Sequence, residues 1–341
     1  MKSSIKEVAY LAGVSIATVS YVLNGTKKVR PETEKRVLDA VKKLNYHVNP
    51  LARNLRKGES KLIGFVVSDF SNYFYQEIAL GLEAQLAKEG YRLILMDSKE
   101  QKENEIENVK NLLSGAIDGL VIAPTTEDCS YLRFLLSNHP IPVAFVDRRP
   151  EGFEGDVVLA TNEQGTYDAI KVLTDKGHKD IAFLGSRMDS TMEERLVGYK
   201  KGLQDAGISV NANYIRFGNH ESVSQRSLRH GLMYNHTSDL ISNYKITAIF
   251  SANNLATVGV FSCIKESGVK VPHDIAFITF DDSFWLTMTS PAIAAVAQNP
   301  EEMGRVAGRL ILERFSNSLS TRKDSYQEVR ISTQFIERNS V

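Results

Sequence analysis

The chain has 341 residues, of which 43% are hydrophobic and 24% charged, an ordinary globular composition that excludes a wholly disordered chain. At roughly 100–200 residues per domain, this length predicts two or three domains. The 41 basic and 41 acidic residues cancel, but they are unevenly placed. Residues 1–60 carry 12 Lys and Arg against 5 Asp and Glu, whereas the remainder carries 29 against 36. A basic head on an acidic body indicates an anionic polymer or surface as the partner of the head.

The sequence shows no sign of export or of insertion into a membrane, so we expect a cytoplasmic protein. The start, MKSSIKEVAY, has no apolar run after its charges, unlike a signal peptide. The longest apolar runs, such as LIGFVV at 62–67, are too short to span a bilayer. Cys129 and Cys263 are too few for a disulfide framework or a zinc site, which favours two reduced thiols in the core.

Residues 1–48 have the pattern of three short helices. Ser4 and Glu7 match a capping box, and the helical spacing of apolar residues that follows ends at Gly13. Ser15 is placed to cap a second helix over 16–23, and Pro31 suits the first position of a third. The apolar stripe of the third helix is predicted to be Val37, Leu38, Val41 and Leu44.

Residues 49–60, NPLARNLRKGES, form a separate linker that contains a helix of about two turns between Pro50 and Gly58. So short a helix is marginal in water because helix nucleation is costly. The segment is therefore either a plain connector or a helix that becomes ordered against a partner.

From Lys61 onward the pattern changes to alternating strands and helices. The strand-like runs are LIGFVV (62–67), YRLILM (91–96), DGLVIA (118–123), PVAFVD (142–147), DIAFLG (180–185), TAIFSA (247–252) and DIAFITF (274–280). The helical stretches between them are 75–89, 102–114, 163–176, 194–206, 254–267 and 300–315. Continuous apolar strands in repeated βαβ units predict parallel sheets covered on both faces. Because some 280 residues are generous for one such sheet, we expect two similar α/β lobes.

The helical head has the spacing of a helix-turn-helix, whose second helix enters the major groove of DNA. Ile16, Ala17 and Tyr21 would then face base edges, while Ser15, Thr18 and Ser20 offer hydroxyl groups to phosphates. The alternative is a small helical domain that binds protein. The positive charge of the head favours DNA.

These residues carry a resemblance to a known family. IKEVAYLAGVSIATVSYVLNG, followed by VRPETEKRVLDAVKKLNYHVNPLARNLRKG, resembles the head of the lactose-repressor (LacI/GalR) family, and the resemblance continues through the body. It implies a bacterial transcription regulator with a helix-turn-helix domain at 1–48, a hinge helix and linker at 49–60, and an effector-binding and dimerisation domain at 61–341. The body then resembles periplasmic sugar-binding proteins, with two Rossmann-like lobes.

The resemblance also implies lobe boundaries and partners. We expect lobe 1 at about 61–161 and 292–322, and lobe 2 at about 162–291 and 323–341. The partners are a pseudo-palindromic double-stranded operator, a second copy of the chain in a homodimer, and a small effector, a sugar or sugar derivative.

The resemblance assigns a wedge to Leu55, which matches a hinge leucine inserted into the minor groove with Ala52 beside it. A packing contact between paired hinges is the other interpretation, and the two are compatible. Tyr21 stands where many members have an arginine suited to guanine, so we expect a different half-site preference. The residues predicted to contact DNA are Ser4, Ser15, Ile16, Ala17, Thr18, Ser20, Tyr21, Asn24, Ala52, Leu55 and Arg56.

A second set of polar and aromatic residues follows the strands of the body, where ligands of open α/β sheets bind. The residues predicted to bind the effector are Asn72, Phe74, Asp147, Arg148, Arg195, Asn253, Asp281, Trp285 and Gln298. Such a mixture pairs with several hydroxyl groups and stacks on a ring. Without the resemblance, Asp147 and Arg148 are equally a salt bridge and Trp285 a core residue. Asn254 departs from the aspartate common in the family, and Asp189 falls at a variable rim position that we leave out.

Two other classes of protein share parts of this pattern. A periplasmic solute-binding protein needs a signal peptide and no basic head, and an α/β enzyme needs a catalytic motif. The sequence has no G-x-G-x-x-G after its first strand, no P-loop and no G-x-S-x-G. His220, His230 and His236 have no metal-binding spacing. We therefore expect a repressor with no enzymatic activity, no cofactor and no metal.

Overall fold

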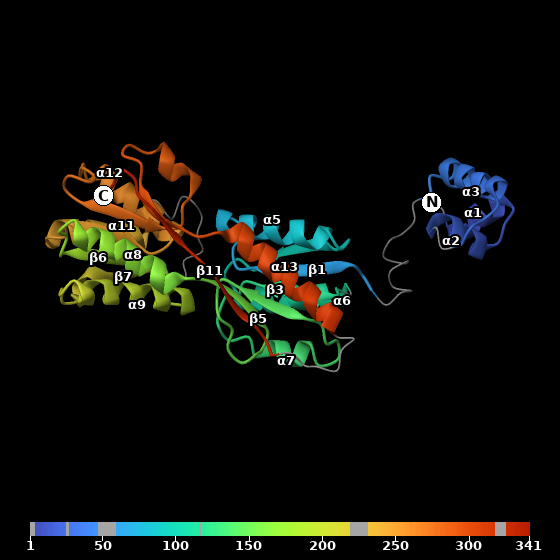
Figure 1. Ribbon diagram of the computed structural model, residues 1–341, viewed down its shortest axis with the longest axis horizontal. Helices are drawn as coiled ribbons and strands as arrows, with labels where there is room; N and C mark the ends of the chain where they lie inside the picture. Colours follow the sequence, from blue (N-terminus) through green and yellow to red (C-terminus); the bar gives the residue numbers. More distant parts are fainter. Residues whose placement is uncertain (1–3, 25–26, 47–58, 116, 219–230, 318–324) are drawn as a thin grey trace. The chain divides into compact units, whose positions relative to one another are not determined.

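The computed structural model of the chain describes residues 4–24, 27–46, 59–115, 117–218, 231–317 and 325–341. It separates into two compact units, Met1–Ser60 and Lys61–Val341, which we describe in turn (Figure 1). The division coincides with the change from a helical to an alternating sequence pattern.

The first unit contains three helices, α1 (Ile5–Ala12), α2 (Ile16–Asn24) and α3 (Pro31–Lys43). The predicted capping box is present, since the Ser4 hydroxyl accepts from the Glu7 N–H and the Glu7 carboxylate accepts from the Ser4 N–H. Gly13 ends α1 at φ 64°, a left-handed conformation that favours glycine. The axes of α1 and α2 differ by 101°, within the range of a helix-turn-helix.

The core of the first unit forms where the three apolar stripes meet. Val8, Val19 and Val37 are fully buried at its centre. One predicted core residue is wrong: Leu38 is 49% exposed, and Ala40 is buried in its place. The reason is helical geometry, because Leu38 is turned by about 100° from Val37 whereas Ala40 lies three positions on, along the same stripe.

The body contains two six-stranded sheets. The first has the order β11-β5-β4-β3-β1-β2, and all its neighbouring pairs are parallel. Its strands are β1 (Leu62–Val67), β2 (Arg92–Asp97), β3 (Gly119–Ile122), β4 (Val143–Val146), β5 (Asp156–Ala160) and β11 (Glu328–Ile331).

The second sheet has the order β12-β10-β9-β8-β6-β7, parallel except that β12 runs antiparallel to β10. Its strands are β6 (Ile181–Gly185), β7 (Ile215–Phe217), β8 (Ala248–Ser251), β9 (Ala276–Phe280), β10 (Ala294–Ala297) and β12 (Gln334–Ile336). The expectation of two similar parallel α/β lobes is confirmed.

Helices cover both faces of each sheet, as continuous apolar strands require (Figure 1). On the first sheet α5 (Tyr73–Ala87) and α13 (Pro300–Asn317) cover one face, and α6 (Lys102–Ser114) and α7 (Tyr131–Leu135) the other. On the second, α8 (Asn162–Asp175) and α9 (Ser190–Asp205) lie opposite α11 (Leu232–Asn243) and α12 (Asn254–Glu266). Two short 3-10 helices, Ala212–Tyr214 and Phe284–Met288, complete the second lobe.

The chain crosses between the lobes at places that differ from the predicted boundaries. β10 belongs to the second sheet, paired with β9, although residues 292–322 were assigned to lobe 1. β11 belongs to the first sheet, paired with β5, although residues 323–341 were assigned to lobe 2. The points at which the chain crosses between the lobes are decided by strand pairing between distant segments. Within residues 292–322, α13 lies on lobe 1 as predicted, whereas β10 does not.

In the described residues, no single helix is long and apolar enough to cross a membrane; α1 and α2 meet that test only together, as a pair bent by 101°.

Candidate functional site

The two lobes place an aspartate at the same point of each fold, directly after a central strand. Asp147 follows β4 and Asp281 follows β9. Their φ angles are +71° and +76°, a left-handed conformation that few residues other than glycine adopt. Each backbone N–H donates to the neighbouring strand, from Asp147 to the Val158 carbonyl at 3.0 Å and from Asp281 to that of Val296 at 2.9 Å. These bonds hold the strained corners and aim both carboxylates beyond the strand ends.

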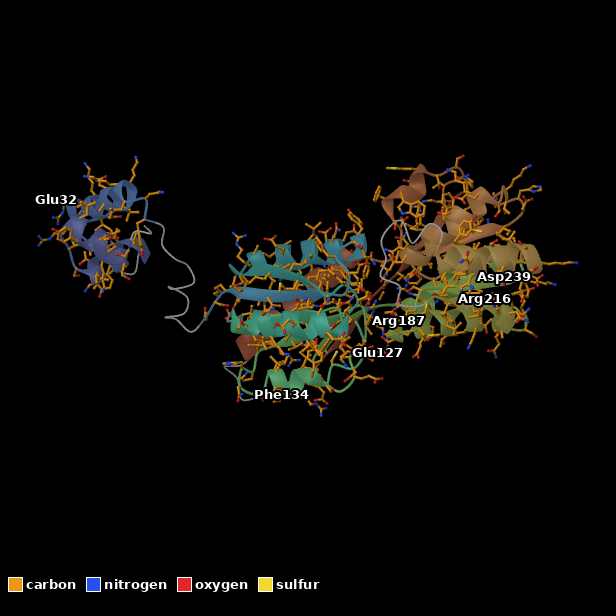
Figure 2. The ribbon with its side chains drawn as sticks, turned by 180° about the vertical axis from the view of Figure 1, so that it is seen from behind. Glu32, Glu127, Phe134, Arg187, Arg216 and Asp239 are labelled. Atoms are coloured by element: carbon orange, nitrogen blue, oxygen red, sulfur yellow. The ribbon has the colours of Figure 1, made fainter. Side chains whose placement is uncertain are left out.

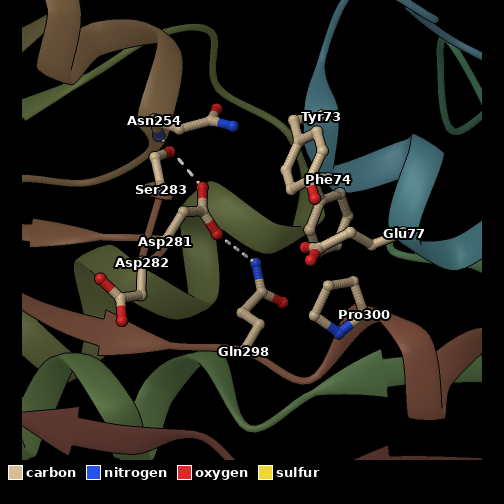
Figure 3. A pocket seen from close by; sticks show the side chains of 9 residues that line it. All are labelled: Tyr73, Phe74, Glu77, Asn254, Asp281, Asp282, Ser283, Gln298 and Pro300. Atoms are coloured by element: carbon tan, nitrogen blue, oxygen red, sulfur yellow. Dashed lines mark hydrogen bonds between the residues drawn. The ribbon is translucent and has the colours of Figure 1, made fainter. Parts of the chain in front are cut away.

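A pocket lies beside Asp281, lined by residues of both lobes (Figure 3). The lining residues are Tyr73, Phe74, Glu77, Asn254, Asp281, Asp282, Ser283, Gln298 and Pro300. Asp281 accepts two hydrogen bonds, from the Gln298 side-chain amide at 2.6 Å and from the Asn254 N–H at 3.0 Å. Three of the predicted effector residues, Phe74, Asp281 and Gln298, therefore lie in one pocket.

Polar contacts join the lobes around this pocket. The Asn254 amide donates to the Asn72 side-chain oxygen at 2.7 Å, and Asn72 caps α5 by accepting from the Phe74 N–H. A further contact between the lobes is made by the Arg187 guanidinium, which donates to the Thr125 carbonyl at 2.6 Å. Figure 2 shows Arg187 close to the junction of the lobes. The carboxyl ends of the two sheets thus face each other, as the strand-end rule predicts.

Arg148 lies at the centre of a buried ion cluster that crosses between the lobes. Its guanidinium donates to the Glu100 carboxylate at 3.0 and 3.2 Å and lies 3.3 Å from Asp189. Arg187 extends the cluster, 3.7 Å from Glu100 and 3.9 Å from Asp189. Burial is the largest single influence and would raise the pKa values of Glu100 and Asp189, but the Arg148 and Arg187 guanidinium groups together with hydrogen bonds hold both below their ordinary values. Arg148 therefore forms salt bridges, as one of the two interpretations predicted, with Glu100, Asp189 and Asp147.

Asp147 is the third carboxylate of this cluster, which has two guanidinium groups, those of Arg148 and Arg187. It accepts from the Tyr75 hydroxyl at 2.8 Å and lies 3.8 Å from the Arg148 Nε. Burial raises its pKa to about 6, although Arg148 and Arg195 act in the opposite direction.

Two further predicted residues support the pocket from behind. Arg195, only 3% exposed, donates to Asn162 at 2.9 Å and to the Ala252 carbonyl at 2.7 Å, with its guanidinium 3.7 Å from the centre of the Phe280 ring. Asn253 caps α12 and donates to the Ser186 hydroxyl at 2.6 Å. These contacts tie together residues that directly follow β6 and β8 and the last residue of β9. Neither Arg195 nor Asn253 lines the pocket.

Trp285 is not where the pocket prediction places it. Its ring packs on the hydrophobic core beneath α12, 5.7 Å from the ring of Phe261, and it does not line the pocket. The 3-10 helix that begins at Phe284 turns the indole toward the core, so the core interpretation of this residue holds. Ser283 faces the pocket instead.

Sequence reasoning missed several residues of this region. Glu77 lies one helical turn beyond Tyr73 and Phe74, so the helical period could have found it. Glu100 follows β2 and Arg187 follows β6, so both lie at the carboxyl ends of strands, where ligands of such sheets bind. Asp189, left out above as a variable rim position, belongs to the ion cluster of Arg148.

In the first unit, α2 presents the side chains predicted to read DNA. Ile16 and Tyr21 are 41% and 39% exposed, and Ala17 is exposed beside them. The Ser15 hydroxyl accepts from the Thr18 N–H at 3.1 Å and so caps α2 as predicted; Ser20 is half-buried. The side chain of Asn24 and the hinge residues Ala52, Leu55 and Arg56 lie outside the described residues.

The remaining candidates for chemistry stay without a role. Over the part of the chain that the structure describes, no group of three His, Cys, Asp or Glu side chains is arranged to hold a metal ion. His236 lies on α11 near the Phe217 carbonyl, while His220 and His230 are outside the described residues. Cys129 and Cys263 are buried free thiols, as expected.

Comparison with known proteins assigns both units. Residues 4–49 match the bacterial regulatory proteins of the lacI family, and residues 170–341 match the periplasmic binding protein-like domain. The chain is 31% identical to the HTH-type transcriptional repressor PurR of Vibrio campbellii, over 99% of this chain and 98% of that protein.

Solved structures share the fold. The lac repressor dimer bound to operator and the anti-inducer ONPF has a TM-score of 0.84 at 24% identity, covering 100% of this chain and 99% of that one. The complex of the transcriptional regulator CelR with cellobiose has a TM-score of 0.70 at 25% identity, covering 99% and 100%.

The fold and the two sites define a transcription regulator with a helix-turn-helix DNA-binding head and a periplasmic-binding-protein-like body. The chain belongs to the lacI family of bacterial regulatory proteins.

Proposed function

We propose that this protein is a repressor that binds a pseudo-palindromic operator as a homodimer and releases or retains it according to a small hydroxylated effector, a sugar or sugar derivative. The operator is read by α2, with Ile16, Ala17 and Tyr21 toward the bases. One head covers one half-site, so two copies read a two-fold site. Because operator DNA lies in the bacterial cytoplasm, the protein acts there. Its proposed role is regulatory and not enzymatic.

The observation that carries the proposal is a pocket whose walls come from both lobes. Phe74 belongs to α5 of the first lobe, and Asp281 follows β9 of the second. A ligand in this pocket contacts both lobes at once, so its affinity depends on their spacing. A ligand shifts an equilibrium only by its differential affinity for the two states, and this arrangement supplies that difference. The repressor PurR and the CelR–cellobiose complex, among the similar proteins, support the choice of repression and of a sugar.

The DNA-binding part is tested by gel shift with the DNA upstream of the protein's own gene. The full chain is expected to bind, and a chain that begins at Lys61 is expected not to bind. Tyr21→Ala should change base preference at one position of each half-site. Tyr10→Ala is the control, since Tyr10 is a tyrosine 91% exposed on α1, outside α2. DNA binding by the shortened chain would contradict the proposal.

The effector part is tested with Asp281→Asn, which keeps the size of the side chain and tolerates the left-handed backbone. The amide loses the negative charge that accepts from Gln298 and from the backbone of Asn254. We expect operator affinity without effector to stay near the wild-type value and the response to a screened sugar library to disappear. A normal response in this variant would rule out the pocket as the effector site.

A further inference from the structure

The pocket around Asp281 contains carboxylates and no basic side chain. Glu77, Asp281 and Asp282 are among its nine lining residues, and none of the nine is Lys, Arg or His. Asp282 is neutralised by Arg338, whose guanidinium donates to both carboxylate oxygens at 2.7 Å. The charges of Glu77 and Asp281 remain without a paired cation among the described residues.

The side-chain carboxylate of Glu77 has neither a hydrogen bond nor an ion pair in the part of the chain that the structure describes. Figure 3 shows its carboxylate directed into the pocket, near the rings of Phe74 and Pro300. Desolvation first, and then the carboxylates of Glu301 and Asp281, raises its pKa above the ordinary value. The contributions of Glu301 and Asp281 reflect a negative potential at Glu77, and within the pocket Glu77 and Asp281 supply one carboxylate from each lobe.

The pocket also contains a buried hydrogen-bond acceptor that has no donor within the described part of the chain. The Gln298 amide nitrogen already donates to Asp281, and that of Asn254 to Asn72. The Gln298 Oε1 is buried and has no hydrogen-bond partner in the described residues. An unpaired buried acceptor costs free energy until a ligand supplies a donor. Each of the two amide nitrogens keeps a second N–H, and Tyr73 and Ser283 carry hydroxyl groups, so the pocket offers a ligand both donors and acceptors, while its unpaired charges are all negative.

Arg148 and Arg195, two buried arginines that the sequence analysis assigned to the effector site, do not neutralise these carboxylates. Arg148 is committed to Glu100 and to the Pro124 carbonyl, and Arg195 to Asn162 and the Ala252 carbonyl. Neither lines the pocket. An anionic ligand in this pocket would therefore be repelled by the carboxylates of Glu77 and Asp281 and would find no basic side chain among the lining residues.

We propose that the pocket selects a hydroxylated effector that carries a protonated amine, an amino sugar or similar amino polyol, and rejects phosphorylated or carboxylated sugars. The ammonium group lies between Glu77 and Asp281, its three N–H donors matching these acceptors. The ring packs on Phe74 and Pro300, and a hydroxyl group donates to Gln298 Oε1. This rests on the proposed function, since it takes the same pocket as the effector site.

The test measures binding by calorimetry with the full-length protein near neutral pH, using matched sets of neutral, aminated and phosphorylated hexoses. The sets are glucose, glucosamine and glucose 6-phosphate; galactose, galactosamine and galactose 6-phosphate; and mannose, mannosamine and mannose 6-phosphate. In at least one set the amino sugar should bind about tenfold more tightly than the neutral parent, and the phosphate more weakly than either. If no amino sugar binds more tightly than its parent, the proposal is overturned.

Glu77→Gln isolates the charge, because it keeps the length of the side chain. The preference for the amine, measured as the ratio of the two affinities on the same variant, should fall from about tenfold to about twofold or less. Glu83→Gln is the matched control, a carboxylate on the same helix that pairs with Arg92 outside the pocket. An equal loss in both variants, or an unchanged preference in Glu77→Gln, would refute the assignment.

The two proposals fail separately. If a neutral sugar binds best and shifts operator affinity, the regulatory function stands and the charge selection falls. If an amino sugar binds best but leaves operator affinity unchanged, the charge selection stands and the proposed function falls.

Discussion

At the scale of single residues, folding buries the carboxyl group of Asp147 in surroundings that disfavour its charged form. Arg148 and Arg187 already face two carboxylates, Glu100 and Asp189, so Asp147 adds a charge that no further guanidinium of this cluster offsets. Its side chain is buried and its pKa is raised to about 6. A raised acid pKa means that the folded state binds the proton more tightly than the unfolded chain does.

The consequence is a pH dependence of stability with a definite sign. Between the ordinary pKa of 3.8 and the folded value of about 6, the free energy of unfolding should fall as pH rises. Asp147→Asn removes this dependence and keeps an acceptor for the Tyr75 hydroxyl. The variant should therefore be more stable than wild type near neutral pH, and the difference should shrink by up to about 3 kcal/mol on acidification.

Urea unfolding at several pH values checks this prediction. The control is Asp175→Asn, which removes an exposed carboxylate that pairs with Lys171 on the surface of α8. Surface pairs contribute little, so its pH profile should follow that of wild type. A difference between Asp147→Asn and wild type that does not vary with pH would contradict the buried-charge argument.

At the scale of elements, the contact of α5 with α13 depends on glycine. A Cβ on Gly81 would lie 1.8 Å from the Glu301 carbonyl oxygen, and one on Gly304 would lie 2.0 Å from that of Ile78. The helices approach so closely that backbone meets backbone. This contact carries the apolar face of α13 onto the first sheet and places Glu301 near Glu77.

Gly81→Ala separates local from tertiary effects because the two have opposite signs. Helix propensity alone predicts a gain of about 1 kcal/mol from alanine in a helix interior. The collision with Glu301 predicts a loss of about 1–3 kcal/mol or more, and we expect the loss to prevail. Thermal or urea unfolding of the full chain measures it.

Gly115→Ala is the control at the end of α6, where φ is −78° and the nearest atom to a new Cβ is 3.3 Å away. Its stability should stay within about 1 kcal/mol of wild type. Equal stability of Gly81→Ala and Gly115→Ala would show that the helices are not in backbone contact.

At the scale of the whole body, the lobes are joined by contacts that a shift of one lobe would break. Arg187 of the second lobe donates to the Thr125 carbonyl of the first, and the Ser190 N–H donates to the Glu127 carboxylate at 2.6 Å. The pair of Asn72 and Asn254 is a third contact between the lobes. These contacts stabilise the lobe arrangement seen here.

Arg187→Gln should loosen this arrangement. Losing a charged hydrogen bond of this kind costs about 1.5–3 kcal/mol, so the balance between the observed and more open arrangements should shift at least about tenfold. Small-angle scattering of the effector-free protein should then show a larger radius of gyration than that of wild type.

The control is Arg216→Gln. Arg216 pairs with Asp239 inside the second lobe, at 3.3 Å, and Figure 2 shows both away from the junction. This variant should keep the wild-type radius. If both arginine variants scatter alike, the Arg187 contact does not hold the lobes.

Local patterns in the sequence determined the elements of this protein and the class of its parts. The capping box at Ser4, the stop at Gly13 and the start at Pro31 each depend on a few neighbouring residues, and all three appear as predicted. The apolar runs of the strands and the polar residues that follow them depend on periodicity and on one edge of a sheet. Short strands such as β7 and β12 escaped, because three residues leave too little pattern to find.

The tertiary structure alone decided which residues meet. Asn72 and Asn254 are 182 positions apart, and Arg149 and Glu328, which also pair, are 179 apart. No local period encodes such pairs. The same holds for β10 and β11, whose sheets follow from strand pairing across the molecule. Trp285 packs on the core because the 3-10 helix that begins at Phe284 sets the direction of its side chain. Glu77 lines the pocket together with Pro300, the first residue of α13. Local chemistry selects elements, whereas packing between distant segments selects the side chains that share a site.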